Sequence, residues 1–463
     1  MKTPTPTQPR RPACACLSVA LLALTSCQMS DPAGNSGGAV PDGIMPGKVD
    51  GGGSVRADSS ANTARGAVSI PSNAGIDQLV VLALQRNPGL TALRQRAERL
   101  SNVPERDRAL PDPMVMAATG SMAETAAGRV QAMTSVSQAI PYPGKRSAAA
   151  AASTREAEAA LSDVAAMELR VEEQIRSAWW DLWLANETRR LKTDSRDLLD
   201  ALRETVDTMV AADRATQADQ LRLTNELASL DQDLIDASRL IGTARARLNN
   251  LLHRPHDAPL PAPRPPASMT SATLDSLLQR AAAAHPEVDA AELRRQAYQH
   301  RIDRARLDSR PDFSLGVTHA AVSDSGLAPM ATGQDQLYAT LGFNIPLWRE
   351  PRRAMIREAE AGWRETDALV SATRADLEYR VAEAHANASA AREIIDVFET
   401  RLIPDADQAH ELANVGYAAG DTSFTEVIET WQEQLRYQLQ HAAARARLAK
   451  ADAALRAAAT PEP

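Results

Sequence analysis

Two glutamates one helical turn apart, Glu426 and Glu429, stand directly after a short turn that contains Gly420 and Asp421. Side chains three residues apart in a helix lie on the same face. Two carboxylates on one face create a negative potential that attracts cations. A solvated helix face is the alternative interpretation, because glutamate is also the ordinary residue on the exposed side of a helix.

The other reactive side chains form no catalytic pattern. The sequence contains no Ser/His/Asp arrangement and no glycine-rich phosphate loop, so it predicts neither an enzyme nor a cofactor. His253 and His256 stand in a proline-rich segment without further ligands, and no metal site is predicted there. Trp179, Trp180 and Trp183 are expected to anchor the packing between helices.

The N-terminal segment resembles a lipoprotein signal. Basic residues are followed by an apolar run over residues 13–24, which ends in the tetrapeptide Leu-Thr-Ser-Cys. This ending resembles a bacterial lipobox, so residues 1–26 are predicted to be a lipoprotein signal peptide and Cys27 the lipidated, palmitate-bearing residue. An ordinary signal peptide with an incidental cysteine is the alternative. Gln28 replaces the aspartate that retains lipoproteins in the inner membrane and favours the outer membrane.

Composition limits the partners and the kind of core. The net charge of -8 is unsuited to binding nucleic acid, which requires a basic face. Aromatic residues make up only 3% of the chain, so the core is expected to come from closely packed, alanine-rich helices. All three cysteines lie at or before Cys27, which excludes a disulfide framework in the rest of the chain.

Two segments rich in loop-forming residues divide the chain. Residues 27–70 are rich in Gly, Ser, Pro and Asp and are expected to be a flexible, lipidated tether. Residues 253–270 carry six prolines and are expected to be a linker. The folded part is thereby divided into two halves, 71–252 and 271–463.

The two halves repeat each other. Asn87-Pro88 corresponds to His285-Pro286, and "LPDPMVMAATG" corresponds to "RPDFSLGVTHA". "SQAIPYPGKR" corresponds to "GFNIPLWREPRR", and the segment from 211 corresponds to the segment from 418. The offsets rise from 198 to 207 residues in one order along the chain, which predicts a duplication.

Each half is expected to contain helix, strand, strand, long helix and returning helix. Apolar residues alternate over 313–317 and 337–345, which is typical of half-exposed strands. The long helices are expected over 146–210 and 351–415, the latter kinked at Pro404. Their lengths match two shorter helices placed end to end, expected over 77–108 plus 216–252 and over 274–308 plus 423–459.

Taken together, the lipobox, the repeated Ile-Pro motifs, the duplicated halves and "YAAGDTSFTEVIET" resemble the TolC-like outer membrane efflux proteins. The resemblance covers about residues 72–459. "IPYPGKR" is similar to the heavy-metal efflux branch of that family. The resemblance implies a mainly α fold with a small transmembrane β part. In such a homotrimer, four strands per chain close a 12-stranded β-barrel, which a helical barrel continues through the periplasm.

The resemblance also assigns roles to particular residues. Asp421, Glu426 and Glu429 would line the closed periplasmic end of the tunnel and bind cations there. The linker 253–270 would lie at the equator of the helical barrel. The strand-to-helix junctions would combine prolines, which end the ladder, with cations at the membrane interface. These junction residues are Pro141, Gly144, Lys145, Arg146, Pro346, Arg352 and Arg353.

The implied function is a passive, lipid-anchored duct in the outer membrane of a Gram-negative bacterium. An inner-membrane pump of the resistance-nodulation-division (RND) type and a periplasmic membrane-fusion adaptor would deliver metal ions or small toxic compounds to it. A type I protein-secretion duct is one alternative. A periplasmic coiled-coil lipoprotein without a channel is another, although such a protein has no need of four alternating strands.

Overall fold

The computed structural model describes residues 70–120, 124–266, 272–325 and 330–459, all within one compact unit. The predicted signal peptide, Cys27 and all but the last residue of the predicted tether lie outside the described residues. None of the described helices is long and apolar enough to cross a membrane.

The first repeat begins with three helices, whereas one continuous helix was expected over residues 77–108. Because the residue before a proline avoids helical backbone angles, Asn87 takes an extended ψ of 117°. Its side-chain Oδ1 then accepts a hydrogen bond from the Leu90 amide at 3.1 Å and caps the following helix. The helices are α1 (Ile76–Arg86), α2 (Pro88–Ser101) and α3 (Val103–Arg108).

The second repeat breaks at the corresponding place, again against the expectation of one helix over residues 274–308. His285 precedes Pro286 and has a ψ of 127°. Its Nδ1 accepts a hydrogen bond from the Glu287 amide at 3.2 Å. The asparagine and the histidine therefore perform the same capping task in the two repeats. The helices are α6 (Leu274–Ala284) and α7 (Pro286–Leu307).

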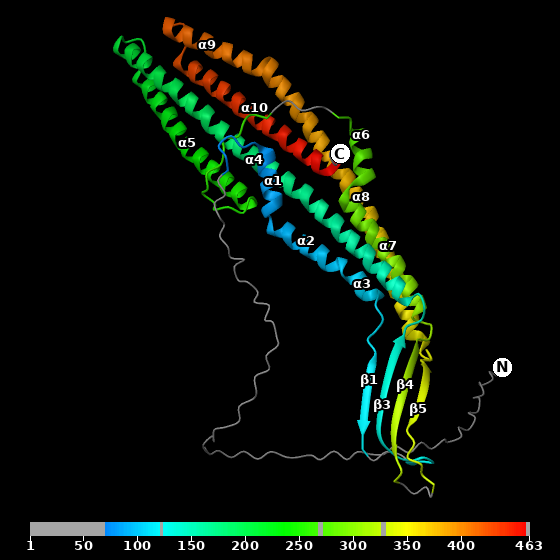
Figure 1. The fold of residues 1–463 in the computed structure, drawn as a ribbon. Helices are drawn as coiled ribbons and strands as arrows, with labels where there is room; N and C mark the ends of the chain where they lie inside the picture. Colours follow the sequence, from blue (N-terminus) through cyan, green and yellow to red (C-terminus); the bar gives the residue numbers. More distant parts are fainter. Residues whose placement is uncertain (1–69, 121–123, 267–271, 326–329, 460–463) are drawn as a thin grey trace, which may run out of the picture. The chain divides into compact units, whose positions relative to one another are not determined.

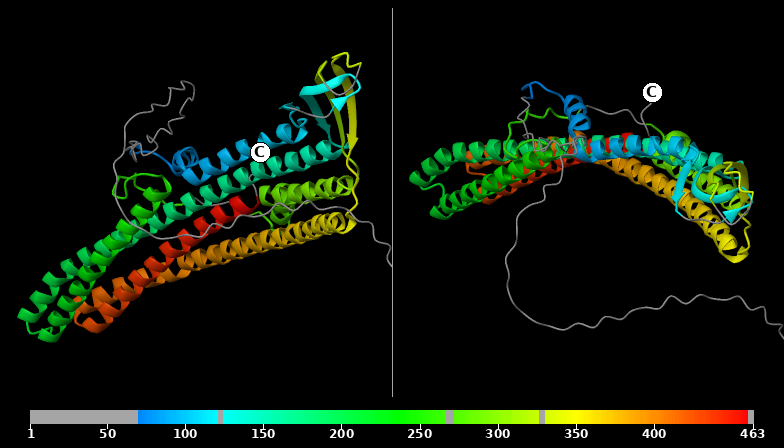
Figure 2. Two further views of the ribbon diagram at one scale, coloured as in Figure 1. Left: turned by 90° about the horizontal axis from the view of Figure 1, so that it is seen from below. Right: turned by 60° about the horizontal axis from the view of Figure 1, so that its bottom comes forward.

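The long helix of the first repeat, α4 (Lys145–Ala211), contains 67 residues, a length of about 100 Å. It packs along α3, α2 and α1 over its first half and along α5 (Gln217–Leu251) over its second half (Figures 1 and 2). Helix α5 begins at a capping box formed by Thr216 and Asp219. One long helix thus lies beside two shorter stretches, as the helix lengths predict.

The long helix of the second repeat is interrupted at Pro404, where the sequence predicts a kink. Proline has no amide hydrogen, and a π-helical turn, Phe398–Leu402, directly precedes this region. At its end the Ile403 amide donates to the carbonyl of Phe398, five residues back. The regular helices around this turn are α8 (Arg349–Val397) and α9 (Ile403–Ala419), followed by the returning helix α10 (Phe424–Ala459).

The strands of both repeats form one antiparallel sheet with the order β1-β3-β4-β5 (Figure 1). The short strand β2 pairs with β3 at the far end from the helices and was not predicted, because two residues carry no readable alternation. Within the described residues β1 and β5 are edges with one partner each. The strands are β1 (Met114–Thr119), β2 (Glu124–Thr125), β3 (Gly128–Ile140), β4 (Phe313–Ser323) and β5 (Gln336–Phe343).

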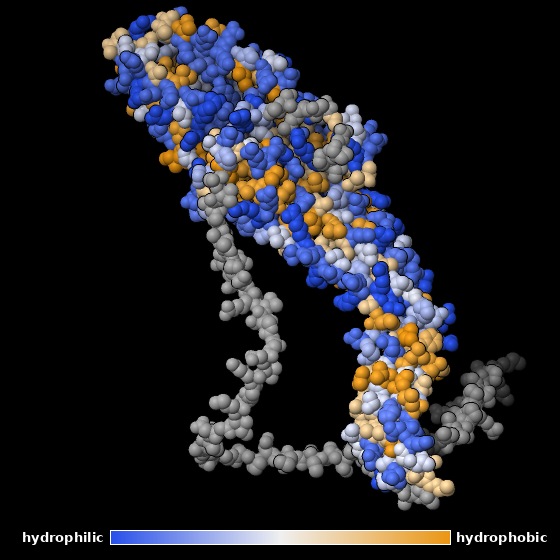
Figure 3. All heavy atoms as spheres, in the orientation of Figure 1, coloured by the Kyte–Doolittle hydropathy of each residue, from blue (hydrophilic) through white to orange (hydrophobic). Residues whose placement is uncertain are grey.

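The sheet has two chemically different faces. Directly paired residues share a face, so the pairs Val115–Val136 and Val136–Val317 place one set of apolar side chains together. The opposite face carries mainly small and polar residues such as Ser314, Thr318 and Thr340. Figure 3 shows hydrophobic side chains gathered over the strands. The apolar face comprises Val115, Val136, Phe313, Leu315, Val317, Leu337, Leu341 and Phe343, all of them exposed in the single chain.

Small side chains provide the helix packing that the low aromatic content requires. Buried alanines recur along α4 and α10, and α4 packs against both α7 and α10. Trp179 is buried in the cluster that α4 forms with α1 and α5, and Trp183 in the cluster near the far end of α4. These tryptophans therefore pack between helices, as expected for anchors of helix–helix contacts.

A cluster of charged side chains joins α4, α7 and α8 at the start of α7. The Glu287 carboxylate accepts hydrogen bonds from Arg170 of α4 at 2.9 Å and from Arg380 of α8. Burial by itself raises the pKa of Glu287, but these two bonds outweigh burial and hold the pKa below its ordinary value of 4.5. The ion pair therefore stabilises the fold above about pH 4.5 and loses this effect as the pH falls through the lowered pKa.

We expect Glu287→Gln to destabilise the protein by about 1–2 kcal/mol at pH 7, since both arginines are partly exposed. Thermal unfolding of wild type and variant, followed by circular dichroism, measures this difference. The difference should shrink as the pH falls below 4.5 and through the lowered pKa, where the wild-type carboxylate becomes protonated. A difference that does not change with pH throughout the acid range would contradict the electrostatic explanation.

Candidate functional site at the helical tips and strand ends

The two helical hairpins of the chain end side by side. The turn 212–216 joins α4 to α5, and the turn 420–423 joins α9 to α10. Arg214 of the first turn donates to the Ala419 carbonyl at 2.9 Å, and Arg222 donates to the Thr425 hydroxyl. Charged side chains of the first repeat thus connect the two tips.

The predicted cation-binding residues lie on this tip surface. Glu426 and Glu429 are exposed on the same side of α10, and Asp421 is exposed in the turn before it. Neither glutamate carboxylate takes part in a hydrogen bond or ion pair with the described residues. The Glu426 amide donates to Ser423 Oγ at 3.3 Å, so Glu426 also occupies the helix position where a negative charge favours the helix dipole.

The corresponding residues of the first repeat are engaged locally. The Asp219 carboxylate accepts from the Thr216 amide at 3.0 Å and from the Thr216 hydroxyl at 2.8 Å. Arg222, which corresponds to Glu429, is bonded to Thr425. Each chain therefore presents free carboxylates at the tip from its second repeat, and its first repeat adds a cation. The structure gives the two repeats unequal roles here.

The first strand-to-helix junction is built around a buried lysine. β3 ends at Ile140 and α4 begins at Lys145, whose side chain is only 7% exposed. Its Nζ donates to Asp312 Oδ1 at 2.8 Å and to the Arg310 carbonyl at 3.0 Å. Gly144 reaches this geometry with a φ of 95°, a region that favours glycine.

This geometry corrects the expected role of Lys145. The sequence suggested a cation at the membrane interface, but Lys145 instead links the first repeat to the segment before β4. Asp312 Oδ1 also accepts from the Tyr142 amide at 2.7 Å, and Asn344 Oδ1 accepts from the Asp312 amide at 2.6 Å. One aspartate thus holds both junctions together.

The other junction cations reach backbone carbonyls or local partners. Arg146 donates to the Arg108 carbonyl at 2.7 Å, and Arg352 donates to the Asp308 carbonyl. Arg353 forms an exposed ion pair with Glu350 at 2.8 Å. Pro141 and Pro346 follow the last strand residues by one and three positions and precede α4 and α8. Sequence reasoning named all these residues but not their partners.

Asp312 and Asn344 are the functional residues that the sequence analysis missed. A signal existed for Asp312, because a Pro-Asp pair stands before the first strand of each repeat, at Asp112 and at Asp312. An aspartate that occurs in both repeats directly before an alternating apolar strand suggests a hydrogen bond to the neighbouring strand-to-helix junction. Asn344 had no such signal, since its position in the first repeat is Ala139.

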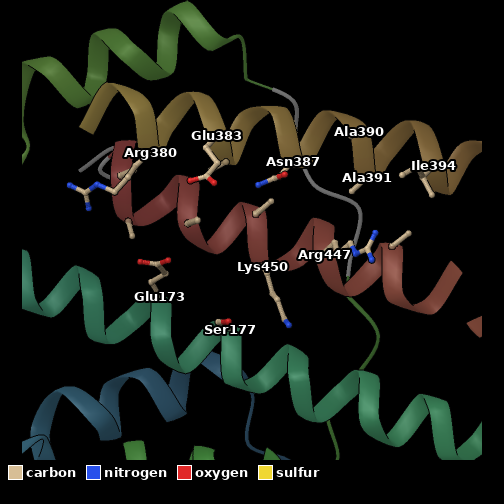
Figure 4. A pocket seen from close by; sticks show the side chains of 16 residues that line it. Glu173, Ser177, Arg380, Glu383, Asn387, Ala390, Ala391, Ile394, Arg447 and Lys450 are labelled. Carbon is tan, nitrogen blue, oxygen red and sulfur yellow. The ribbon is translucent and has the colours of Figure 1, made fainter. Parts of the chain in front are cut away.

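A cavity of about 560 Å³ opens between α4, α8 and α10 (Figure 4). Its wall carries the acids Glu173 and Glu383 and the bases Arg380, Arg447 and Lys450. Burial raises the pKa of Glu173, although Arg380 and Arg170 oppose this effect. With both signs of charge on its wall, the cavity has no single preference for cations or anions.

The described residues contain no group of three or more His, Cys, Asp or Glu side chains able to hold a metal ion. In the described part of the linker 253–270, His253 has a left-handed φ of 56°, and the His256 carbonyl accepts a hydrogen bond from Asn249 at 3.2 Å. Both histidines therefore belong to the turn that follows α5.

Comparisons with known proteins place this geometry in context. Residues 277–460 match the family model described as Outer membrane efflux protein. The matched segment contains α7 to α10, the second junction and the tip glutamates. The family resemblance predicted from the sequence is thereby confirmed.

Relatives extend the match to both repeats. The cobalt-zinc-cadmium resistance protein CzcC of Cupriavidus metallidurans is 25% identical over 309 residues, 64% of this chain and 70% of CzcC. The outer membrane protein VceC of Vibrio cholerae has a TM-score of 0.71 at 20% identity, covering 83% of this chain and 95% of VceC. The outer membrane channel CmeC of Campylobacter jejuni has a TM-score of 0.68 at 15% identity, covering 83% and 85%. The predicted fold class, mainly helical with a small sheet, is confirmed.

For the efflux-protein fold the Lys145–Asp312 bond is expected to be structural. We expect Lys145→Ala to destabilise the protein by about 2–3 kcal/mol, because it leaves Asp312 without its buried cation. Lys145→Arg should retain most of the stability. Thermal unfolding of the detergent-solubilised protein measures both.

Arg353→Ala is the matched control for this prediction. Its ion pair with Glu350 is exposed, with side chains 62% and 71% accessible, and should contribute less than about 0.5 kcal/mol. Equal unfolding temperatures for the Lys145→Ala and Arg353→Ala variants would show that the buried Lys145–Asp312 ion pair stabilises the protein no more than the exposed pair does.

Proposed function

We propose that this protein is the outer membrane duct of a tripartite efflux system, a passive channel without catalytic chemistry. One observation carries the proposal: an antiparallel sheet with an exposed apolar face continues directly into long helices, of which α4 is about 100 Å long. The apolar face suits contact with lipid, and the polar opposite face suits a water-filled interior. The efflux-protein domain over residues 277–460 supports the same function.

A trimer follows from the unpaired edges of the sheet. Strand edges in lipid must be satisfied by other strands, so only a closed barrel is stable in a bilayer. Four principal strands per chain give twelve in a homotrimer, which is our proposal for the assembly. The 11 residues of β4 and 13 residues of β3 are long enough for tilted strands that cross the membrane.

Divalent transition-metal ions are the proposed cargo. Among the relatives, CzcC is named as a cobalt-zinc-cadmium resistance protein, and it matches 64% of this chain. Exposed, unpaired carboxylates at the helical tip suit the passage of cations. Small toxic organic compounds are the second candidate, because the family resemblance of the sequence implies either class of cargo.

The hairpin tips are the proposed docking surface for the partners. An inner-membrane pump of the RND type would supply the energy, and a periplasmic adaptor would join it to the turns 212–216 and 420–423. The described chain offers no nucleotide-binding loop from which the duct could draw energy itself. This arrangement leaves selection of the cargo mainly to the pump.

Two other functions remain as outcomes of the test. A type I protein-secretion duct would share the fold but accumulate an exported protein in the medium. A periplasmic scaffold without a channel would not conduct ions. Purified protein in planar bilayers should form stable, trimer-sized channels, and deletion of the gene should increase sensitivity to cobalt, zinc or cadmium. Absence of conductance would refute the duct.

We further propose that Asp421, Glu426 and Glu429 form the periplasmic constriction. In a trimer, three copies of each residue would approach one axis. Glu429 is the sharper test, because Glu426 also serves the start of α10. We expect Glu429→Gln to lower cation selectivity in planar bilayers, with Glu426→Gln/Glu429→Gln lowering it further. The effect should shrink at 1 M salt, where the Debye length is about 3 Å.

Glu393→Gln is the control for charge removal. Glu393 is an exposed glutamate on α8, distant from the tip along the same repeat. Its removal also takes one negative charge per chain and should leave selectivity close to wild type. If Glu429→Gln and Glu393→Gln behave alike at low salt, the tip glutamates form an ordinary solvated helix face.

Lipidation of Cys27 is proposed as the anchor in the outer membrane. The lipobox-like ending at Cys27 and the following Gln28 support this proposal. We expect Cys27→Ala to abolish metabolic labelling with palmitate, whereas Cys16→Ala should retain it. Channels formed by Cys27→Ala should still conduct, since the sheet inserts independently of the anchor. Palmitate label on the Cys27→Ala protein would disprove the assignment.

A further inference from the structure

Helix α10 separates two hollows of the structure. One side of the helix, with Ala449 and Arg456, faces the start of α1 and the described part of the linker 253–270. The other side, with Arg447 and Ala454, lines the cavity of about 560 Å³ (Figure 4). The lining of this cavity comes from α4, α8 and α10 of a single chain. Its volume is in the range of pockets that hold drug-sized molecules.

The hydrogen bond between Lys450 of α10 and Asp181 of α4 fixes how these two helices are aligned. Helix α4 runs from the sheet toward the tips and α10 runs back, so the two are antiparallel (Figure 1). Glu173 precedes Asp181 by eight residues, about 12 Å toward the sheet. Arg447 precedes Lys450 by three residues, about 4.5 Å toward the tips. The cavity residues Glu173 and Arg447 are therefore about 16 Å apart along the helices.

A second contact aligns α8 with α10 in the same way. The Nε2 atom of His441 lies 3.0 Å from the Glu399 carboxylate, in the π-helical turn that follows α8. Glu383 precedes Glu399 by 16 residues, about 24 Å toward the sheet. Arg447 follows His441 by six residues, about 9 Å in the same direction. Glu383 therefore lies about 15 Å from Arg447 along the helices, at the end of the cavity where Figure 4 also shows Glu173.

This first end of the cavity carries an excess of negative charge. Arg380 lies here, but it is already bonded to the carboxylates of Glu287 and Asp376. Glu173 and Glu383 take part in no hydrogen bond or ion pair with the residues that the structure describes. Burial raises the pKa of Glu173, because the carboxylate is partly removed from water. A cation placed here would compensate both unpaired carboxylates.

The opposite end carries an excess of positive charge. Lys450 and Arg247 share the one carboxylate of Asp181. Arg447 is exposed, and within the described part of the chain it has no hydrogen-bond or ion-pair partner. The planar guanidinium group of an arginine is well suited to bind a carboxylate through two hydrogen bonds. Between the two ends the wall consists mainly of alanine side chains, among them Ala384, Ala391, Ala451 and Ala454.

We propose that this cavity binds a small zwitterionic molecule, with its ammonium group at Glu173 and Glu383 and its carboxylate at Arg447. Because these side chains reach into the cavity from helix positions about 15 Å apart, the two charges of the ligand must be roughly 10–14 Å apart. An extended chain of three or four amino acids spans about this length. The alanine wall leaves room for a peptide backbone with small side chains. Short peptides with free termini are therefore the ligand class.

Isothermal titration calorimetry with tetra-alanine tests the site in the detergent-solubilised full-length protein. We expect saturable binding to one site per chain at low salt. N-acetylation of the peptide removes the ammonium charge, and C-amidation removes the carboxylate. Each modification should weaken binding about tenfold, since a charge-assisted hydrogen bond is lost. Equal affinities for the free and the blocked peptides would overturn the proposal.

Variants of the protein assign each end of the peptide to its residues. Arg447→Gln should weaken binding of the free peptide about tenfold but leave binding of the C-amidated peptide unchanged, because both changes remove the same contact. Glu173→Gln/Glu383→Gln should behave in the same way toward the ammonium group, with the N-acetylated peptide as the comparison. If the losses from the peptide and the protein add up instead, the peptide does not bind in this orientation.

Glu378→Gln and Arg374→Gln are the controls for the removed charges. Both residues are exposed on α8 and lie outside the lining of the cavity, so their variants should bind tetra-alanine like the wild type. Ala390→Phe fills the cavity from an exposed position on α8 and should abolish binding without removing a charge. Wild-type affinity of the Ala390→Phe variant would place the peptide elsewhere and refute the site.

This inference goes beyond the proposed duct, because a single chain contains the whole site, and the two can fail separately. A channel that conducts but does not bind tetra-alanine refutes the peptide site and leaves the duct. A protein that binds the peptide but forms no channel keeps the site and refutes the proposed function.

Discussion

The hydrogen-bonded ladder between β3 and β4 joins the two repeats, and the placement of the helices depends on it. Residues 129–140 of β3 pair with residues 313–323 of β4 along almost their full length. Strand β3 continues into α4 through a turn of four residues, and α7 leads into β4 through a similarly short segment. Such short connections leave little freedom, so the register of one strand pair fixes which helices meet above the sheet.

The junction residues transmit that register from strand to helix. The backbone hydrogen bonds between the strands end where the prolines interrupt the ladder. Within a few residues, the Lys145–Asp312 ion pair joins the two segments instead. Burial makes this pair sensitive to geometry, since a displaced partner would leave a charge without compensation. The same aspartate also accepts from Tyr142 and donates its amide to Asn344, so both junctions move together.

The helical part uses small residues where other proteins use aromatic ones. Alanines on α4 and α10 allow the neighbouring helices to approach closely, and Trp179 and Trp183 are buried in the clusters between helices. At the far end the two tips are tied by two arginines of the first repeat, while the second repeat leaves its carboxylates free. Equivalent positions of the two repeats therefore differ in role: those of the first repeat join the tips, and those of the second repeat carry the free negative charges.

The sequence by itself determined the local features of this protein. Alternation of apolar residues predicted β4 and β5, and the repeated motifs predicted the matching strands of the first half and the family. Proline and glycine predicted the ends of the helices. These signals are short-range, because backbone preference and side-chain period act over a few residues. The helix breaks at Asn87 and His285 also had a local signal, because each residue precedes a proline. They were not predicted, because the segments on both sides of each proline have a helical sequence pattern.

Only the tertiary structure decided which distant residues meet. The bond between Lys145 and Asp312 spans 167 positions, and the bond between Arg222 and Thr425 spans 203. Nothing in the charge pattern selects these partners, because many acids and bases of the chain are equally suitable by type. The selection comes from the strand register and from the packing of the long helices, which bring particular side chains within hydrogen-bond distance.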